Sequence, residues 1–168
     1  MPIPDSLGFP NGNKYDLLIA GWTKFWNEIL KPEDPPTPDF IKALIATESS
    51  FNLVKDQKSS NGSARGLIQV TESTRKILQN LKGELRNDHI ELTVEESRDP
   101  VTNIAAGIRW LHHKKFLAVS RLKRKITWEE AAAEYKGILN DMGKDKRTDR
   151  IMKDLKEFHQ RLKSIRKN

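Results

Sequence analysis

The sequence contains three patterns typical of helix starts, and they constrain the fold more than any other feature. Thr37 precedes Pro38 and Asp99 precedes Pro100, so a capping side chain twice stands directly before a proline, which suits the first helical position. Thr127 is followed three residues later by glutamate, which is the pattern of a capping box. Apolar residues recur at helical spacing after each start. The sequence therefore predicts a mainly α fold.

The apolar pattern divides the chain into six expected helices and two irregular connections. Residues 51–70 lack helical periodicity and contain the small polar run Ser59 to Ser63, which favours a folded loop or a short hairpin. A polar, poorly periodic connection occupies residues 82–98. The expected helices and their apolar positions are 15–30 (Leu17, Leu18, Trp22, Phe25, Trp26, Ile29), 38–49 (Phe40, Ile41, Leu44, Ile45), 72–81, 100–116 (Ile104, Ile108, Leu111, Phe116), 128–136 (Ala131, Ala132, Ala133) and 145–165 (Ile151, Leu155, Phe158, Leu162).

A length of 168 residues fits one domain with a modest core. We expect a single domain over residues 1–168 and a monomer, with an N-terminal helix at about 14–31 and a basic C-terminal helix at about 145–166 packed on it. The chain has no cysteine and only four scattered histidines, so we expect no metal and no cofactor. No apolar run reaches the length of a membrane span, and residues 1–10 do not resemble a signal peptide.

The net charge of +7 is concentrated at one end of the chain. Residues 114–168 hold 17 Lys and Arg against 8 Asp and Glu, whereas the rest holds 13 against 15. Such a positive field attracts polyanions, which include nucleic acid and the phosphate-rich and carboxylate-rich polymers of bacterial walls. Charge alone does not choose between these partners.

Glu48 is the residue most suggestive of chemistry. It follows the apolar face of a predicted helix, lies near the C-terminal end of that helix and precedes the irregular loop. The negative end of the helix dipole and an apolar setting both disfavour the ionised carboxylate, so the group is suited to act as a proton donor. A glutamate near a helix end also has a plain structural interpretation, as a solvated side chain. The surrounding residues are needed to decide.

Three segments around Glu48 resemble the soluble lytic transglycosylases and the goose-type lysozymes. Residues 45–52 read IATESSFN and resemble the signature of the catalytic helix. Residues 63–69 read SARGLIQ and are similar to the Gly-Leu-Met-Gln segment, with isoleucine in place of methionine, while residues 99–111 read DPVTNIAAGIRWL and are similar to the Asn-Ile-x-x-Gly-x-x-Tyr-Leu helix. The fourth element is kept in part, as EYKG at 134–137, where Lys136 replaces asparagine. Together the matches cover most of residues 38–137.

The resemblance implies a lysozyme-like helical domain with a small irregular or β-hairpin region beside the catalytic helix. It makes Glu48 the catalytic residue and places Tyr135 where its hydroxyl reaches the Glu48 carboxyl. Asn103, Ile104 and Gly107 are explained by helix packing, and Ile68 is expected to shape the floor of the groove. The residues that the resemblance assigns to substrate binding are Ser49, Gly66, Leu67, Ile68, Gln69 and Tyr135.

The family chemistry needs only one protein carboxylate, because N-acetylmuramic acid supplies its own nucleophiles. Glu48 would protonate the glycosidic oxygen and then deprotonate the 6-hydroxyl of the sugar, which leaves a 1,6-anhydro end. Asp56 and Glu72 are the first acidic residues that follow Glu48 in sequence, and both are interpreted as surface charges. If water took the place of the 6-hydroxyl, the same site would be a goose-type hydrolase, and the sequence leaves that alternative open.

Two further interpretations come from other classes of protein. A basic helical module would bind nucleic acid or another anionic polymer through residues 121–125 and the last helix, although no nucleic-acid motif is present and nucleic acid is not the expected partner. The second interpretation is an inactive lysozyme-like piece of a phage tail or secretion apparatus. The retained Glu48 argues against it. For the active enzyme we expect peptidoglycan strands as substrate, action at the cell wall or periplasm, and anionic wall polymers as partners of the basic end. Delivery would then be through a phage, holin or secretion system, or the chain would be a mature fragment.

Overall fold

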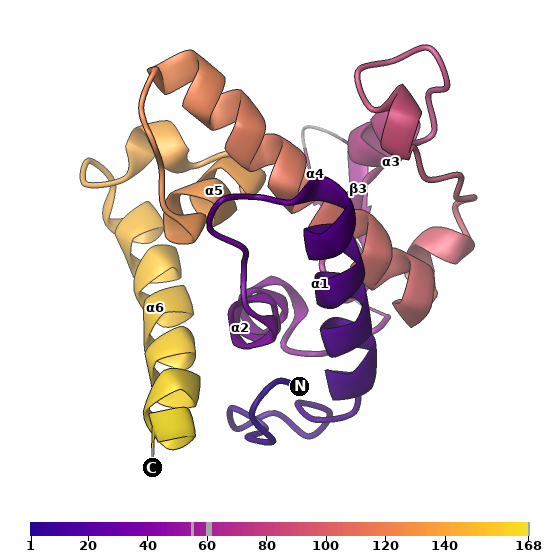
Figure 1. Ribbon diagram of the computed structural model, residues 1–168. Helices are drawn as coiled ribbons and strands as arrows, with labels where there is room; N and C mark the ends of the chain where they lie inside the picture. Colours follow the sequence, from indigo (N-terminus) through magenta and orange to yellow (C-terminus); the bar gives the residue numbers. More distant parts are fainter. Residues whose placement is uncertain (55, 60–61, 168) are drawn as a thin grey trace.

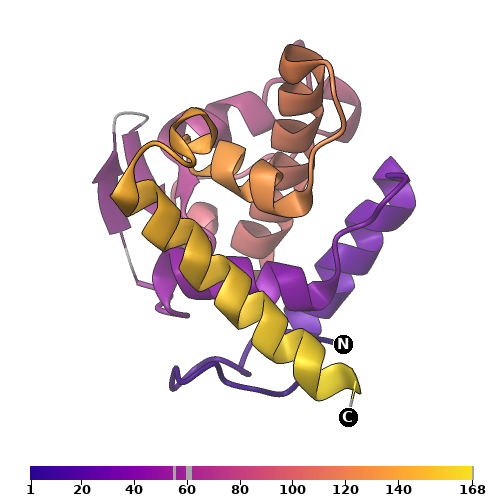
Figure 2. The same cartoon turned by 90° about the vertical axis from the view of Figure 1, so that its left-hand side faces the viewer.

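Helix α2 (Pro38–Ser49) lies at the centre of the fold, and its start is the one that the sequence predicts. The Thr37 hydroxyl accepts a hydrogen bond from the Phe40 amide at 3.2 Å, with Pro38 in the first turn. Helix α1 packs on one side of α2, and α6 crosses it on another, as Figure 1 and Figure 2 show from two directions. The catalytic helix of the predicted fold is thus held from several sides.

The computed structural model describes residues 1–54, 56–59 and 62–167. Within these residues the chain forms six α-helices, three short 3-10 helices and one three-stranded antiparallel sheet with the order β1-β2-β3, which confirms the mainly α prediction. The elements other than α2 are α1 (Asp16–Leu30), β1 (Asp56–Ser59), β2 (Gly62–Arg65), β3 (Val70–Thr71), α3 (Glu72–Leu78), η1 (Arg86–Asp88), η2 (Glu96–Arg98), α4 (Pro100–Leu122), α5 (Trp128–Tyr135), η3 (Leu139–Asp141) and α6 (Lys146–Lys167).

The predicted hairpin is present beside α2. Strands β1 and β2 pair with Asp56 opposite Arg65 and Gln57 opposite Ala64, and β3 pairs with β2 through Arg65 and Val70. Ser60 and Asn61, which the sequence places in the turn, lie outside the described residues. The sheet therefore carries the chain from the end of α2 to the segment that closes on it.

The other two predicted helix starts are also confirmed. The Asp99 carboxylate accepts from the Val101 and Thr102 amides at 3.0 and 3.2 Å, so it caps α4. Thr127 and Glu130 form the capping box at the start of α5: the Thr127 hydroxyl accepts from the Glu130 amide, and the Glu130 carboxylate accepts from the Thr127 amide. Each cap satisfies amide groups that a helix start leaves unpaired.

Helix α2 is buried on more sides than its apolar pattern indicates. The sequence predicts one buried face, but Asp39 and Lys42 are buried as well. The first sixteen residues cover them: the Lys42 ammonium lies 2.8 Å from the Asp16 carboxylate and also donates to the Ile3 carbonyl, while Asp39 accepts from the Ile3 amide. An apolar pattern does not reveal such burial, because the charged groups are paired inside the fold.

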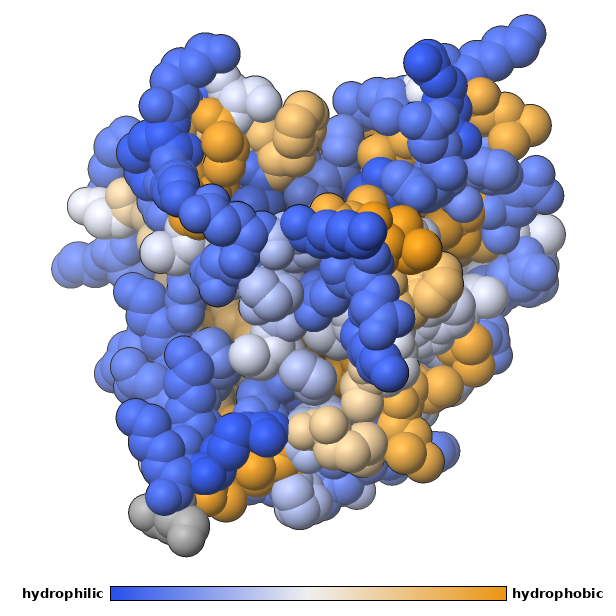
Figure 3. Space-filling view, in the orientation of Figure 1, coloured by the Kyte–Doolittle hydropathy of each residue, from blue (hydrophilic) through white to orange (hydrophobic). Residues whose placement is uncertain are grey.

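The apolar face of α1 is only partly buried, which corrects the expected packing. Ile19 and Trp26 face the core, whereas Leu17, Phe25 and Ile29 are 77%, 43% and 49% exposed. Helix α1 lies at the edge of the molecule and packs mainly on α2 and α4, which leaves its outer apolar residues exposed. Figure 3 shows apolar side chains gathered on the side of the molecule where α1 lies.

The inward positions of α4 and α6 were predicted with one clear error. Ile104, Ile108 and Leu111 are buried as expected, but Phe116 is 64% exposed. Helix α5 folds back along the opposite side of α4, where Ala118 is buried, and the Phe116 ring stacks on His113 at the surface. In α6 the leucines at 155 and 162 are buried, whereas the isoleucine at 151 and the phenylalanine at 158 are half-buried. Among the described residues, no helix combines the length and the apolar character that crossing a bilayer demands.

Candidate active site

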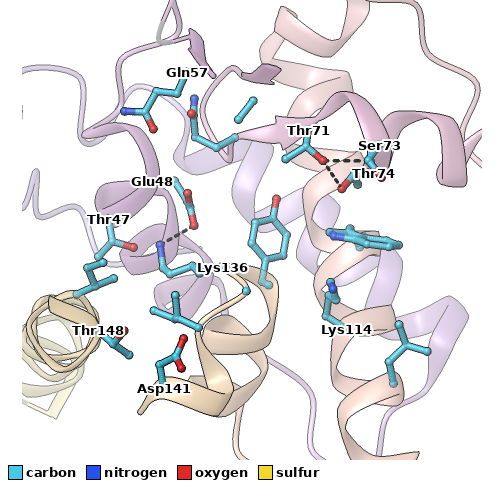
Figure 4. Close-up of a pocket in the computed structure, with 18 of the residues that line it drawn as sticks. Thr47, Glu48, Gln57, Thr71, Ser73, Thr74, Lys114, Lys136, Asp141 and Thr148 are labelled. Atoms are coloured by element: carbon cyan, nitrogen blue, oxygen red, sulfur yellow. Dashed lines mark hydrogen bonds and ion pairs between the residues drawn. The ribbon is translucent and has the colours of Figure 1, made fainter. Parts of the chain in front are cut away.

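A cleft of about 880 Å³ opens between the sheet, α4, α5 and α6, and the C-terminal end of α2 forms part of its wall. Figure 4 shows its polar lining, with Glu48 from α2 and Lys136 from the end of α5 pointing toward one another. The cleft is lined by residues from nine helices and strands, and its volume is large enough to hold part of an extended chain.

Glu48 occupies the last turn of α2, where the helix stops abruptly. Ser50 and Phe51 both adopt positive φ, at 55° and 59°, a region that non-glycine residues seldom enter, and this turns the chain away from the helix axis. The Glu48 side chain is 13% exposed and faces the cleft. Its carboxylate accepts a hydrogen bond from the Lys136 ammonium at 2.5 Å. The expected apolar surroundings of Glu48 are therefore wrong, because a cation lies against it.

The segment 66–69 faces Glu48 and is held in a strained turn. Gly66 has a φ of 72°, and an added Cβ there would lie 2.6 Å from the Asn103 side chain. Gln69 also has a positive φ, at 55°, and its side-chain amide donates to the Gly66 carbonyl at 2.8 Å. Non-glycine residues in this conformation persist only where the surroundings enforce it, and functional sites are a common place for them.

Asn103 on α4 holds the segment 66–69 in this conformation. Its carbonyl oxygen accepts from the Ile68 amide at 2.9 Å, and its amide nitrogen donates to the carbonyls of Arg65 and Ser97 at 2.9 and 2.7 Å. Asn103 is fully buried, so these bonds are shielded from water. The structural interpretation of Asn103 is thus supported, through hydrogen bonds to the loop as well as through helix packing.

Tyr135 reaches the same segment from α5. Its hydroxyl donates to the Ile68 carbonyl at 2.7 Å, so its one proton is directed to the loop and not to the Glu48 carboxyl as the sequence predicts. Burial, and to a lesser degree the negative charge of Glu48, raise the pKa of Tyr135 well above its usual value. The phenol therefore stays protonated and ties α5 to the loop that faces Glu48.

The structure brings three of the predicted site residues to the cleft, namely Glu48, Gln69 and Tyr135. The side chains of Ser49, Leu67 and Ile68 are buried in the core, and the Ser49 hydroxyl donates to the Ile45 carbonyl of its own helix. Ile68 packs against Gly107 of α4, where an added Cβ would lie 2.1 Å from its Cγ2 atom. These buried residues and Gly66 hold the cleft wall in place from behind.

The first two acidic residues that follow Glu48 in sequence, Asp56 and Glu72, are both paired with arginines. Asp56 accepts from Arg98 at 2.7 Å at the surface. Glu72 is held by Arg75 and Arg65 at 2.7 and 2.9 Å, and these contacts lower the pKa of Glu72 to about 2, with the Arg75 hydrogen bond as the largest cause. Both groups are bound as carboxylates, which agrees with their interpretation as structural charges.

Sequence reasoning missed other residues that line the cleft. Trp110 and Lys114 of α4 lie on one side, with the Lys114 ammonium 5.3 Å from the centre of the Trp110 ring. Glu84 approaches from the connection before α4, and Asp141 and Asp145 from the segment before α6. Trp110 stands in the 99–111 motif, but the other residues are neither near Glu48 in sequence nor in a motif, so only the folded arrangement reveals them.

The sequence model of the Transglycosylase SLT domain matches residues 30–158, more than two thirds of the chain. This chain belongs to the SLT transglycosylase family. The comparisons with curated proteins and with solved structures gave no significant match. The helical fold with its small sheet is consistent with the lysozyme-like fold of an SLT domain.

Membership connects the cleft to a substrate class. SLT domains act on peptidoglycan, so this SLT domain is assigned the cell wall as its place of action and the glycan polymer as its substrate. The matched range includes α2, the sheet, α4 and α5, which together form most of the cleft. Residues 1–29 precede the matched range, although they pack on α2 through Asp16 and Ile3.

Proposed function

We propose that this protein is a lytic transglycosylase that cleaves the β-1,4 bond between N-acetylmuramic acid and N-acetylglucosamine and leaves 1,6-anhydro ends. The observation that carries the proposal is Glu48, a carboxylate on the wall of the cleft beside a strained, fully braced loop. Glu48 protonates the glycosidic oxygen, and the carboxylate that remains takes the proton of the 6-hydroxyl as that oxygen closes on the anomeric carbon. The acetamido group of the sugar stabilises the anomeric carbon between the two steps.

The other predicted site residues support this chemistry by position. Gln69 and Tyr135 line the cleft beside Glu48, and we assign them to sugar binding or to the shape of the sugar site. Ser49, Gly66, Leu67 and Ile68 act from behind the wall, by holding the end of α2 and the loop. We also infer that residues 1–168 form one domain, because the first sixteen residues satisfy the buried charges of α2.

The deciding experiment is mass analysis of the muropeptides released from purified peptidoglycan. Anhydro ends support transglycosylation, whereas reducing ends identify a goose-type hydrolase acting from the same cleft. The acidic side chains Glu84, Asp141 and Asp145 on the cleft wall keep the hydrolase as a specific alternative, because hydrolysis commonly uses a second carboxylate. Release of no glycan fragment at all contradicts both.

The role of Glu48 is tested by Glu48→Gln, which keeps the shape of the side chain but cannot donate a proton. We expect a loss of at least about 100-fold in lysis with an unchanged circular dichroism spectrum. Glu33→Gln is the matched control, because Glu33 also pairs with a lysine, Lys125 at 2.8 Å, but at an exposed site outside the cleft. Equal lysis by Glu48→Gln and the control would remove Glu48 from the mechanism.

Helix α6 gives the protein a basic surface that suits anionic wall polymers. Its exposed side carries lysines and arginines along its whole length, while its apolar side packs on α2. We propose that this surface holds the enzyme near the wall by long-range attraction, which salt screens over about 8 Å at physiological ionic strength. Binding to purified wall should weaken as salt is added, and salt-independent binding would contradict this role.

A further inference from the structure

The ammonium of Lys136 lies against the carboxyl that the proposed reaction uses. Lys136 Nζ is 2.5 Å from Glu48 Oε1, and the two side chains are only 10% and 13% exposed. Charge-assisted hydrogen bonds are short, and at such a distance a proton moves between donor and acceptor with little displacement of the heavier atoms. The contact therefore places the Lys136 ammonium in direct hydrogen-bond contact with the Glu48 carboxylate, with no group between them.

The backbone around the pair explains why a cation is held here. Glu48 lies in the last turn of α2, and Lys136 is the C-terminal cap of α5, so two helix C-termini meet at one side of the cleft. Each C-terminus carries a partial negative charge, which disfavours a carboxylate and favours a cation. The contact pairs the Lys136 ammonium with the Glu48 carboxylate, and a carboxylate has no proton to give.

We propose that Lys136 is the proton reservoir of Glu48, and that its ammonium passes a proton to the Glu48 carboxylate when a glycan strand fills the cleft. The inference rests on the proposed function, because it concerns the acid step of that reaction. A bound glycan displaces water, and separated charges are less stable in the drier site than a hydrogen-bonded amine and carboxylic acid. Lys136 acts through Glu48 and is a positioning residue, not a group that touches the sugar.

The proton balance closes without another reactant. An N–H bond of Lys136 breaks as the O–H bond of Glu48 forms, and Glu48 then gives this proton to the glycosidic oxygen as the bond from that oxygen to the anomeric carbon breaks. The 6-hydroxyl oxygen bonds to the anomeric carbon and loses its proton to the Glu48 carboxylate. That proton returns to the Lys136 amine, which restores the ammonium and carboxylate for the next cycle.

Among the described residues, the other charged groups of the cleft are set apart from this role by their own contacts or by their position. Tyr135 is kept protonated by burial and directs its proton to the Ile68 carbonyl. The remaining titratable or charged residues that line the cleft are Glu84 and Lys114 on the side of α4, and Asp141, Asp145 and Arg147 on the side of η3 and α6. Glu84 lies 3.1 Å from His113, and Lys114 lies over the Trp110 ring, so each has its own partner.

The test compares Lys136→Arg with Lys136→Gln in initial rates of anhydro-muropeptide release, measured from about pH 5 to about pH 9. Arginine keeps the positive charge and the hydrogen bond but does not release its proton. We expect Lys136→Arg to lose about 100-fold or more at every pH. Lys136→Gln leaves a lone carboxyl, so we expect activity at acidic pH and an alkaline limb that falls at lower pH than in the wild type.

The matched controls are Lys125→Arg and Lys125→Gln, which change the exposed pair with Glu33 by the same substitutions. We expect both to keep the wild-type profile, and an equal shift in these controls would attribute the effect to overall charge and overturn the proposal. Wild-type rates in Lys136→Arg would reduce Lys136 to a charge partner, and faster release by Lys136→Gln at neutral pH would make the pair an inhibitory contact. Either result overturns it.

The test separates this inference from the function on which it rests. Anhydro products from the wild type, with unshifted profiles in both Lys136 variants, would reject the proton transfer and leave the transglycosylase intact. Absence of glycan products from the wild type would reject the function itself. Urea unfolding of each variant verifies that it folds, and the Lys136→Gln profile decides the question alone if the bulkier arginine does not fit.

Discussion

The contact between Gly107 and Ile68 links the stability of the helical core to the shape of the cleft, and Gly107→Ala tests that link. Alanine in a helix interior is favoured over glycine by about 1 kcal/mol. Here, however, the new methyl would lie 2.1 Å from Ile68 Cγ2 and 3.0 Å from Cδ1. Overpacking of a core costs about 1–3 kcal/mol, and a contact this short belongs at the upper end. We therefore expect a net loss of about 2 kcal/mol in the free energy of unfolding.

A double-mutant cycle isolates the clash. Ile68 is fully buried, so Ile68→Ala alone should cost about 2–5 kcal/mol. In the double variant the nearest remaining atom is the Cβ of residue 68, at 3.1 Å, and the new methyl fills part of the cavity. The loss of stability in the double variant should then be smaller than the sum of the two single losses by about 1–3 kcal/mol.

Urea unfolding followed by circular dichroism measures all four proteins of the cycle, with Gly21→Ala as the control. Gly21 lies in α1 with nothing within 4 Å of an added Cβ, so that variant should gain about 0.5–1 kcal/mol. If the two single losses sum to the loss in the double variant within about 0.5 kcal/mol, the reasoning is refuted, because the side chains at 68 and 107 then do not clash.

Three further outcomes follow from buried polar groups. Burial, then the charges of Arg109 and Lys115, lower the pKa of His112 to about 4 from 6.5, so its neutral form favours the fold. That stability is present above pH 6.5 and is lost as pH falls toward 4. Urea titrations should show a loss of about 2 kcal/mol by about pH 5. The variant His112→Phe should not show this loss. Lys42→Met leaves the Asp16 carboxylate buried without its cation and should cost about 3–5 kcal/mol, whereas similar stability of variant and wild type in thermal melts would contradict this. Tyr135→Phe removes the bond to the Ile68 carbonyl and should slow lysis several-fold at unchanged secondary structure, while unchanged rates would make the bond dispensable for the cleft.

The starts of three helices were predictable because their signals are local, whereas the end of α4 at Leu122 lies beyond the expected end at residue 116. Thr37, Asp99 and Thr127 cap helices that begin where the sequence predicts, since a cap needs only a side chain and the amides within three residues of it. The buried faces were less predictable. Phe116 and the outer residues of α1 are apolar but exposed, because burial depends on which elements happen to cover a helix, and this is set by residues far away in sequence.

The site was predictable as a set of segments but not as a set of contacts. The motif resemblance brought Glu48, Gln69 and Tyr135 together, and the structure places all three on the cleft. It did not reveal that the Tyr135 proton is directed to the Ile68 carbonyl, or that Asn103 makes hydrogen bonds to Arg65, Ile68 and Ser97. Those contacts join residues 35 to 67 positions apart, or depend on which of several partners lies nearest, so no spacing in the sequence encodes them.

The substitution of lysine for asparagine at residue 136 shows how one such contact changes the chemical question. From sequence, a helix C-terminus and an apolar setting make Glu48 a ready acid; in the fold, the Lys136 ammonium reverses the local balance of charge. A site that kept Glu48 ionised throughout would lack the proton that cleavage requires. The short contact resolves this, since the cation that holds the carboxylate is itself a proton source, whereas an arginine in the same place would not be. Under the proposed proton transfer, the identity of residue 136 sets the range of pH over which Glu48 can act as an acid.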